Sequence, residues 1–345
     1  METFAFPTRD DYKAAMLIAG IDEAGYGPLL GPLVVSAAAF EFPEPLDMTD
    51  IGAGKKLWSR LAPMVISKPP VKSGKLIIAD SKVVHRLSDG NKYLERAVLA
   101  IHRLNPQTAA PPENWNQLLT ALGIATHLDQ QPSLLPWHSN VALPAFGEAG
   151  AIAIAANMLQ SVIRSGNTPP AGIWTRVMDV PEFNRLVTAT DNKASVLTSI
   201  TMMHARHLHD QFHESDLLLF IDKQGGRDHY TRLLMNTFPD LPLKVVLESA
   251  QESRYLITTP PRKGKTLIIF REKAEQHCLA TALASMVCKY IRELYMTMFN
   301  QWWKAQIMDL APTAGYYTDA IRWLARAEPE FPRLGIHREN VIRIK

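Results

Sequence analysis

The 345-residue sequence has few of the features that mark secreted or membrane proteins. Its two cysteines, Cys278 and Cys288, lie ten residues apart in one apolar stretch, which predicts buried thiols and no disulfide framework. The longest apolar runs are far shorter than the roughly 20 residues that a bilayer span needs. The first residues include acids and no long apolar segment, so we expect no secretory signal. These absences predict a cytoplasmic protein without a membrane partner.

A large excess of one charge is also missing. The 37 Lys and Arg residues face 34 Asp and Glu residues, for a formal net charge of +3. This balance does not indicate a nucleic-acid partner by itself, but it leaves room for a local basic face. Apolar residues at 47% and charged residues at 21% are typical of globular domains. Strand-like segments alternate with helical ones, which predicts an α/β fold.

Carboxylates stand at the ends of two apolar, strand-like segments. Asp22 and Glu23 interrupt IAGIDEAGYG, and Asp222 ends DLLLFID. Acids beside a packed strand cost free energy unless an ion pair, a metal ion or a helix N-terminus answers them. Mg²⁺ prefers such hard oxygen ligands, and two ions can serve phosphodiester cleavage. The alternative is that Asp22 caps a turn and Asp222 pairs with Arg227.

Other segments carry weaker signals. Residues 181–212 predict a long helical region with a break near Thr190, and its histidines, from His204 to His213, predict a solvated helix face more readily than a zinc site. The segment RYLITTPPRKGKTLIIFRE predicts a β-hairpin whose basic tip could touch phosphate. GYGPLLG could be mistaken for a dinucleotide loop, but a strand-like run follows it where a helix is required.

Several motifs, taken together and in order, resemble the type 2 ribonuclease H family, which includes ribonuclease HII and the catalytic subunit of its eukaryotic counterpart. The segment GIDEAGYGPLLGPLVV is similar to the opening pattern of the family. ADSK, IDKQGG and KAEQHCLATALASMVCKYIRE are similar to its later motifs, and GYYTDA and IHR fall in its C-terminal positions. The resemblance extends from residue 18 to residue 345.

This resemblance implies a ribonuclease H-like mixed β-sheet flanked by helices, with a C-terminal helical portion. The implied division is a catalytic domain at residues 1–300 and a helical portion at 301–345. Residues near 45–72 and 105–168 look like insertions relative to the usual family length.

The resemblance also implies a site. Four carboxylates would hold Mg²⁺ or Mn²⁺, and five further residues would bind nucleic acid. The carboxylates are Asp22, Glu23, Asp222 and Glu275, and the substrate-binding residues are Gly25, Tyr26, Gly27, Lys82 and Tyr316.

Two of these positions depart from the family. The family has Asp where this chain has Glu275, and Glu252 is a rival for the same role. The family has Arg or Lys where this chain has Tyr26, so the loop lacks its phosphate-pairing cation.

The function implied is a divalent-metal-dependent endonuclease that hydrolyses the RNA strand of RNA–DNA hybrids, leaving 5′-phosphate and 3′-hydroxyl ends. A monomer is the expected state. Two alternatives stay open: a nuclease on the same fold with altered substrate choice, and a nucleic-acid-binding protein whose metal site has decayed. Tyr26 bears on specificity, whereas Glu275 bears on catalysis.

Overall fold

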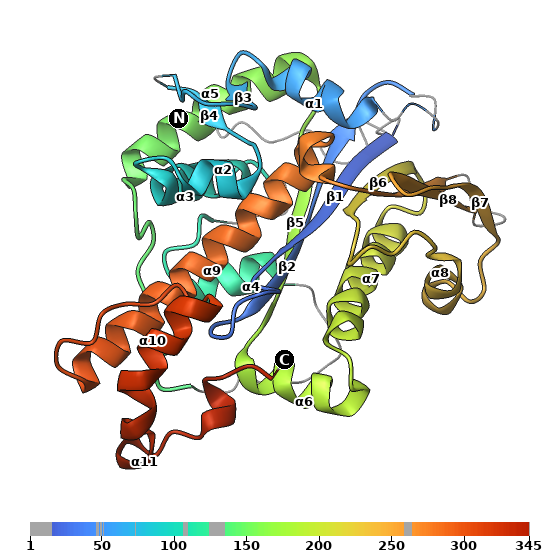
Figure 1. The fold of residues 1–345 in the computed structure, drawn as a ribbon. Helices are drawn as coiled ribbons and strands as arrows, with labels where there is room; N and C mark the ends of the chain where they lie inside the picture. The colour runs from blue at the N-terminus through green and yellow to red at the C-terminus, as the bar shows by residue number, and fades with distance from the viewer. Residues whose placement is uncertain are drawn as a thin grey trace.

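The computed structural model describes residues 16–45, 48, 50, 52–72, 74–105, 110–123, 135–258 and 264–344. Within these residues a seven-stranded sheet has the strand order β5-β2-β1-β6-β9-β8-β7 (Figure 1). Its strands are β1 (Met16–Ala24), β2 (Leu33–Phe42), β5 (Pro170–Met178), β6 (Asp216–Asp222), β7 (Leu243–Glu248), β8 (Glu252–Thr258) and β9 (Lys265–Arg271). A separate parallel pair consists of β3 (Val65–Ile66) and β4 (Leu76–Ile77).

The sheet is mixed. β2 is antiparallel to both β1 and β5, whereas β1, β6 and β9 are parallel to one another. β8 and β7 then add in antiparallel fashion, so β8 and β9 form the predicted hairpin. The predicted tip of that hairpin, including Arg262 and Lys263, lies outside the described residues. The mixed β-sheet predicted from the sequence is confirmed.

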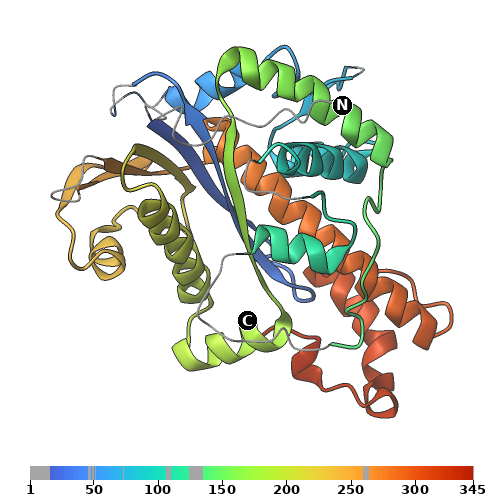
Figure 2. The same cartoon turned by 180° about the vertical axis from the view of Figure 1, so that it is seen from behind.

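Helices cover both faces of this sheet (Figures 1 and 2). The long helix α9 (Leu279–Gln306) crosses one face along β1 and β2. On the same side lie α1 (Ala53–Leu61), α2 (Ser81–His85), α3 (Gly90–His102), α4 (Trp115–Leu122) and α5 (Ala149–Gly166). The opposite face is covered by α6 (Val180–Thr190), α7 (Lys193–Gln211) and α8 (Thr231–Thr237).

The alternation of side chains along β1 explains the two layers. Ile18 belongs to the core on the α9 side, while its neighbours Leu17 and Ala19 belong to the core on the α7 side. All three are buried, as expected for an inner strand with both faces covered. Both faces are therefore packed, and the strand ends are left to carry polar side chains.

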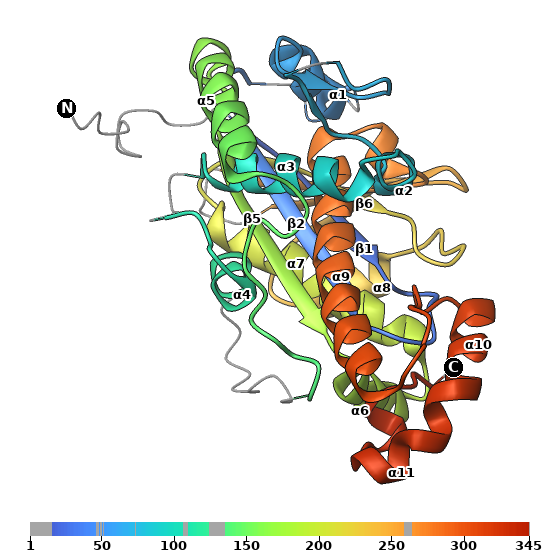
Figure 3. The same cartoon turned by 90° about the vertical axis from the view of Figure 1, so that its left-hand side faces the viewer.

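The C-terminal portion packs on the end of α9 (Figure 3). It consists of α10 (Tyr317–Ala327), α11 (Phe331–Leu334) and the short 3₁₀ turns η2 (Glu328–Glu330) and η3 (Arg338–Asn340). The ring of Trp303 is fully buried, with its centroid 5.1 Å from that of Trp323 and 5.4 Å from that of Phe331. The division of the chain at residue 300 stays a prediction, and it passes through α9.

The segments predicted as insertions contribute helices. The first contains α1 and β3, and the second contains α4 and α5. The predicted break near Thr190 is confirmed, because α6 ends there and Asn192 caps α7 by accepting hydrogen bonds from the amides of Ala194 and Ser195. Among the described helices, none is both long and apolar enough to cross a bilayer.

Candidate functional site

The candidate site forms where the parallel strands β1 and β6 end side by side. Their register pairs Ile21 with Ile221, so Asp22 on β1 and Asp222 on β6 follow at neighbouring positions. Glu23 comes next on β1, and its amide donates a 2.8 Å hydrogen bond to Oδ1 of Asp22. Strand carboxyl ends are where sites assemble in sheets of this kind. The structure thus places three of the four predicted carboxylates together at the carboxyl ends of two inner strands.

Glu275 lies at the same end of the sheet, because β9 is parallel to β6 and ends beside it. It lies in the 3₁₀ turn η1 (Ala274–Gln276), between β9 and α9. The amide of Ala274 donates a 3.1 Å hydrogen bond to Oδ1 of Asp222, which fixes the turn against the end of β6. The negative charge of Asp222 acts on Glu275, so the fourth predicted carboxylate lies within electrostatic range of the others.

The rival for the fourth position has partners of its own. The carboxylate of Glu252 forms ion pairs with Arg254 and, at 3.0 Å, with Arg271. Two guanidinium groups thus already compensate the negative charge of Glu252. The proposed pairing of Asp222 with Arg227 is also not present among the described ion pairs, and the guanidinium of Arg227 lies over the ring of Tyr230 at 5.9 Å.

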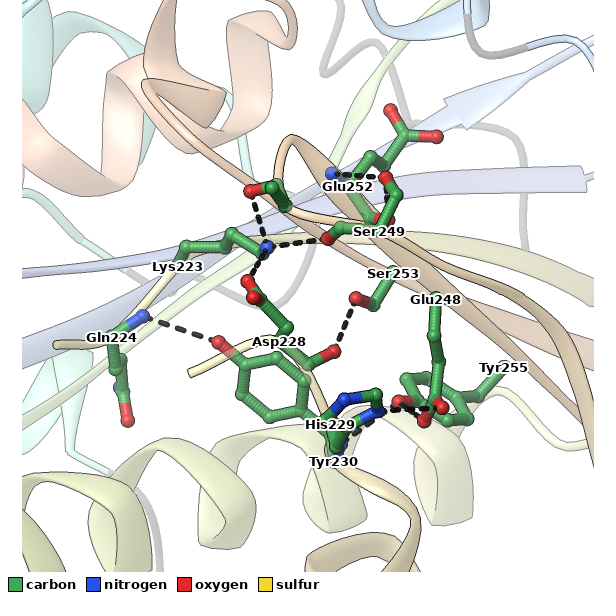
Figure 4. Close-up of polar contacts among 11 residues, drawn as sticks. Lys223, Gln224, Asp228, His229, Tyr230, Glu248, Ser249, Glu252, Ser253 and Tyr255 are labelled. Atoms are coloured by element: carbon green, nitrogen blue, oxygen red, sulfur yellow. Dashed lines mark hydrogen bonds and ion pairs between the residues drawn. The ribbon is translucent and has the colours of Figure 1, made fainter. Parts of the chain in front are cut away.

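Lys223 follows Asp222 directly, but its ammonium group contacts residues outside the candidate site (Figure 4). Its ammonium group pairs with Asp228 at 2.6 Å and donates to the carbonyl oxygens of Ser249 and Ala250 at 2.8 and 2.6 Å. Only 4% of its side chain is exposed. Lys223 therefore joins the segment after β6 to the β7–β8 connection. Its ammonium group does not pair with the carboxylates of the candidate site.

Lys82 is the cation that acts on the carboxylates. It lies in the first turn of α2, where the side chain of Asp80 accepts a 2.8 Å hydrogen bond from its amide. Its positive charge lowers the pKa values of Glu23, Asp222 and Glu275. The structure thus places Lys82 of the ADSK segment near the carboxylates, and its contact with a substrate phosphate stays a prediction.

One lysine does not balance four acids. Burial raises the pKa of Asp22 well above its usual range, and the charges of Glu23 and Asp222 raise it further. Burial and Asp222 raise the pKa of Glu23 to about 7, even with Lys82 nearby. Burial is also the main reason that the pKa values of Asp222 and Glu275 are raised. The cluster has a deficit of positive charge.

The donor set fits a hard divalent cation, although no ligand sphere is assembled in full. Within the described part of the chain, no three His, Cys, Asp or Glu side chains lie together as a ready metal site. All four converging groups are carboxylates, the ligands that Mg²⁺ and Mn²⁺ prefer. A divalent cation would supply the positive charge that the cluster lacks.

Two serines beside the acids were not identified from the sequence. Ser285 of α9 hydrogen-bonds to Asp22, which lowers the pKa of that carboxyl. Its hydroxyl also lies 2.9 Å from that of Ser81, the first residue of α2. The signal was present in the ALASM segment, where Ser285 falls on the helix face that packs on β1, but a lone serine in a helix carries no specific meaning.

The glycine loop follows the acids directly. Gly25 and Gly31 have φ values of +87° and +81°, which explains the need for glycine at both positions. Tyr316 lies next to this loop, because the carbonyl of Gly315 accepts hydrogen bonds from the amides of Leu29 and Leu30 at 2.8 and 3.2 Å. Tyr316 is 52% exposed, so the structure places an accessible tyrosine beside the loop.

The histidine prediction was wrong for two residues. His204 and His209 are buried, so they do not lie on a solvated face of α7. Nε2 of His204 lies 3.1 Å from the carbonyl oxygen of Val35, and Nδ1 of His209 lies 2.9 Å from the hydroxyl of Thr266. Burial lowers the pKa of His204 to about 3. These histidines pack α7 onto the sheet.

Both thiols are buried, as predicted. Sγ of Cys288 lies 3.2 Å from the carbonyl oxygen of Asp22, so this cysteine packs α9 directly behind the acids.

Fold and site together define a mixed β-sheet, covered by helices, with a carboxylate cluster at the ends of its central strands. Searches of family models and of curated proteins found no match. Among solved structures, the chain is similar to ribonuclease HII of Archaeoglobus fulgidus, solved in complex with PCNA, at 15% identity and a TM-score of 0.43 over 96% of this chain and 95% of that one.

The chain is also similar to ribonuclease H2 of Pyrococcus horikoshii OT3, at 13% identity and a TM-score of 0.41 over 94% of this chain and 92% of that one. A third similar structure is Bst-RNase HIII in complex with Mn²⁺, at 15% identity and a TM-score of 0.40 over 96% of this chain and 67% of that one. These structures are type 2 ribonucleases H.

Proposed function

We propose that the protein is a cytoplasmic, divalent-metal-dependent endonuclease that hydrolyses the RNA strand of RNA–DNA hybrids. The observation that carries this proposal is the convergence of four carboxylates near Lys82, those of Asp22, Glu23, Asp222 and Glu275. The order of the sequence motifs gives separate support, because the residues that resemble family ligands are the same ones that converge.

In this proposal the four carboxylates would hold Mg²⁺ or Mn²⁺, which would activate water and stabilise the charge that develops on the phosphate. The chain contributes position and electrostatics. Asp22 and Glu23 are fixed by β1, Asp222 by its hydrogen bond from Ala274, and no side-chain nucleophile is needed. Lys82 would bind a substrate phosphate at the edge of the cluster.

Substrate contacts would come from the glycine loop and its neighbour. Gly25, Tyr26 and Gly27 would approach the sugar–phosphate backbone, and Tyr316 would pack against the sugar. The 2′-hydroxyl that such a loop could read is what distinguishes RNA from DNA.

The second candidate is a nucleic-acid-binding protein with a decayed metal site. One observation favours it: in the described residues, no three potential ligands form a ready metal site. Glu275 in place of the family's Asp is the residue at which such decay would begin, since a displacement of about 1 Å can cost about 10²-fold in rate.

The test is cleavage of three labelled duplexes by purified protein with Mg²⁺ and with Mn²⁺. The duplexes are an RNA–DNA hybrid, a DNA duplex with one embedded ribonucleotide, and all-DNA, and Asp22→Asn is run in parallel. We expect cleavage of the hybrid that is lost in Asp22→Asn. Binding without cleavage of any duplex would support the second candidate and refute the first.

The identity of the fourth ligand has its own test. We expect Glu275→Gln to lower the rate of hybrid cleavage by about 10²-fold or more at unchanged stability, because a weakened ligand would leave the metal ion misplaced relative to the reacting phosphate. Glu252→Gln is the matched variant, and its effect should fall on stability, since it breaks ion pairs with Arg254 and Arg271. The reverse pattern would assign the role to Glu252.

A further inference from the structure

Tyr26 stands where the resemblance calls for a cation, yet positive charge surrounds the glycine loop. Arg343, near the end of the chain, is 3% exposed and lies against the loop. Its guanidinium donates to the carbonyl oxygen of Gly25 and, at 3.5 Å, to that of Tyr26. The same group lies 3.8 Å from the centroid of the Phe183 ring. Arg343 of the C-terminal segment therefore holds the loop through its carbonyl groups.

That contact determines where the loop amides point. In a planar trans peptide the C=O and N–H groups point in opposite directions. Because Arg343 binds the carbonyls of Gly25 and Tyr26, the amides of Tyr26 and Gly27 point away from it. Neither amide donates a hydrogen bond to any other residue that the structure describes. Gly27 is exposed, and a Cβ added there would meet no atom within 4 Å, so the loop is open at this residue.

Lys193 contacts the Tyr26 side chain of the same loop. It is the first residue of α7, and its ammonium nitrogen lies 4.8 Å from the centroid of the Tyr26 ring. The Tyr26 ring thus orients Lys193 by a cation–π contact. Lys193 lines a small cavity together with Tyr26, Gly27 and Arg343. The two aromatic contacts, to Tyr26 and Phe183, bring a lysine and an arginine to one loop.

Two of the cations at this loop have no carboxylate partner in the described part of the chain. Neither Lys193 nor Arg343 forms an ion pair within the described ranges of the chain. A third cation, Arg292, is 2% exposed beneath the loop and donates to the carbonyl oxygen of Leu30 at 3.0 Å. Burying guanidinium groups without acids costs free energy unless an anion or hydrogen bonds answer them. The outward amides and the lysine offer an anion a place on the open side.

We propose that Lys193 is the phosphate-binding cation of this loop, and that Arg343 is a positioning residue that turns the Tyr26 and Gly27 amides toward the same phosphate. This inference rests on the proposed function, and the ligand is a backbone phosphate of the nucleic-acid substrate. The Tyr26 ring then positions Lys193 through the cation–π contact. Tyr26 replaces the Arg or Lys of the family, and the phosphate-binding cation comes from α7 in place of the loop.

The test measures binding by the full-length protein carrying Asp22→Asn, so that no substrate is cleaved. Affinity for a fluorescently labelled RNA–DNA hybrid is measured by anisotropy across a series of KCl concentrations. A lysine that binds one phosphate contributes about 0.9 to the slope of log affinity against log salt. We expect Lys193→Met to reduce the slope by about that amount and Lys193→Arg to retain it.

Lys304→Met is the matched control, because it removes the same charge from an exposed position in the last turn of α9. Its slope should equal that of the parent. Equal slopes for Lys193→Met and Lys304→Met would overturn the assignment of Lys193.

Arg343 is tested by a different signature. Because it contacts the loop and not the phosphate, Arg343→Met should weaken hybrid binding about tenfold or more without changing the salt slope, and Arg343→Lys should recover part of the affinity. A purely structural role would lower the melting temperature and leave the affinity of the folded protein unchanged, and that result would overturn the positioning role. Should Arg343→Met not fold, Arg343→Lys decides by the same criterion.

The two proposals fail in distinguishable ways. A protein that cleaves the hybrid but whose Lys193→Met behaves like Lys304→Met refutes this inference alone. A protein that binds no nucleic acid refutes both.

Discussion

Glu95 offers a quantitative test of how the second insertion is attached to the core. This carboxylate is fully buried on α3. Its Oε1 accepts hydrogen bonds from the amide of Ala145 at 2.6 Å and the hydroxyl of Tyr290 at 2.9 Å. Its Oε2 accepts from the amides of Phe146 and Gly147 at 2.9 and 2.6 Å. One side chain therefore connects the inserted segment to α3 and α9.

The expected cost follows from this count of donors. Four donors point at an acceptor-only group, and a buried donor left unpaired costs about 1–3 kcal/mol. The losses do not add fully, and single substitutions seldom exceed about 5 kcal/mol. We therefore expect Glu95→Ala to lower the free energy of unfolding by about 3–5 kcal/mol. Glu95→Gln should cost nearly as much, about 2–4 kcal/mol, because its amide group would face donors.

The assay is urea unfolding followed by circular dichroism, with a midpoint and slope for each variant. Glu148→Gln, an exposed change next to the same loop, is the control and should stay within about 0.5 kcal/mol of the parent. A cost of less than 0.5 kcal/mol for Glu95→Gln would refute the reasoning, since it would mean that the pocket does not require a carboxylate.

Two further predictions concern α9. A Cβ at Gly20 would lie 2.2 Å from the backbone nitrogen of Thr281, so Gly20→Ala should force α9 away from β1 and lower the free energy of unfolding by about 1–3 kcal/mol or more in urea titrations; a neutral result would contradict the close approach. Burial raises the pKa of Glu293, but His85 and Lys289 more than offset this and hold it at about 2. Since that value is below the ordinary 4.5, the ionised Glu293 stabilises the fold fully above about pH 4.5, and this stabilisation is lost as the pH falls toward 2. The difference in unfolding free energy between the parent and Glu293→Gln should therefore shrink by about 2 kcal/mol between pH 7 and pH 3. A difference that does not change with pH would refute this prediction.

Much of the fold could be predicted from local pattern. The apolar runs of β1 and β6 ended at acids, and parallel pairing then brings Asp22 and Asp222 together. The break after Thr190 also followed from local signals, because Asn192 is a good helix cap. These features depend on residues close together in sequence.

What could not be predicted depends on distant packing. The histidines of α7 look polar in the sequence, but His204 meets the Val35 carbonyl of a strand about 170 residues away, which periodicity does not reveal. Arg343 reaches Gly25 from the far end of the chain. A basic residue near a terminus has no local signature that distinguishes it from a solvated one.

The most direct test of the central claim is calorimetric titration of the full-length protein with Mn²⁺, with Asp22→Asn beside it. An intact carboxylate cluster predicts two Mn²⁺ ions bound per chain by the parent, and the loss of this binding in Asp22→Asn. No Mn²⁺ binding by the parent, or equal binding by Asp22→Asn, would contradict the assignment of Asp22, Glu23, Asp222 and Glu275 as a metal centre.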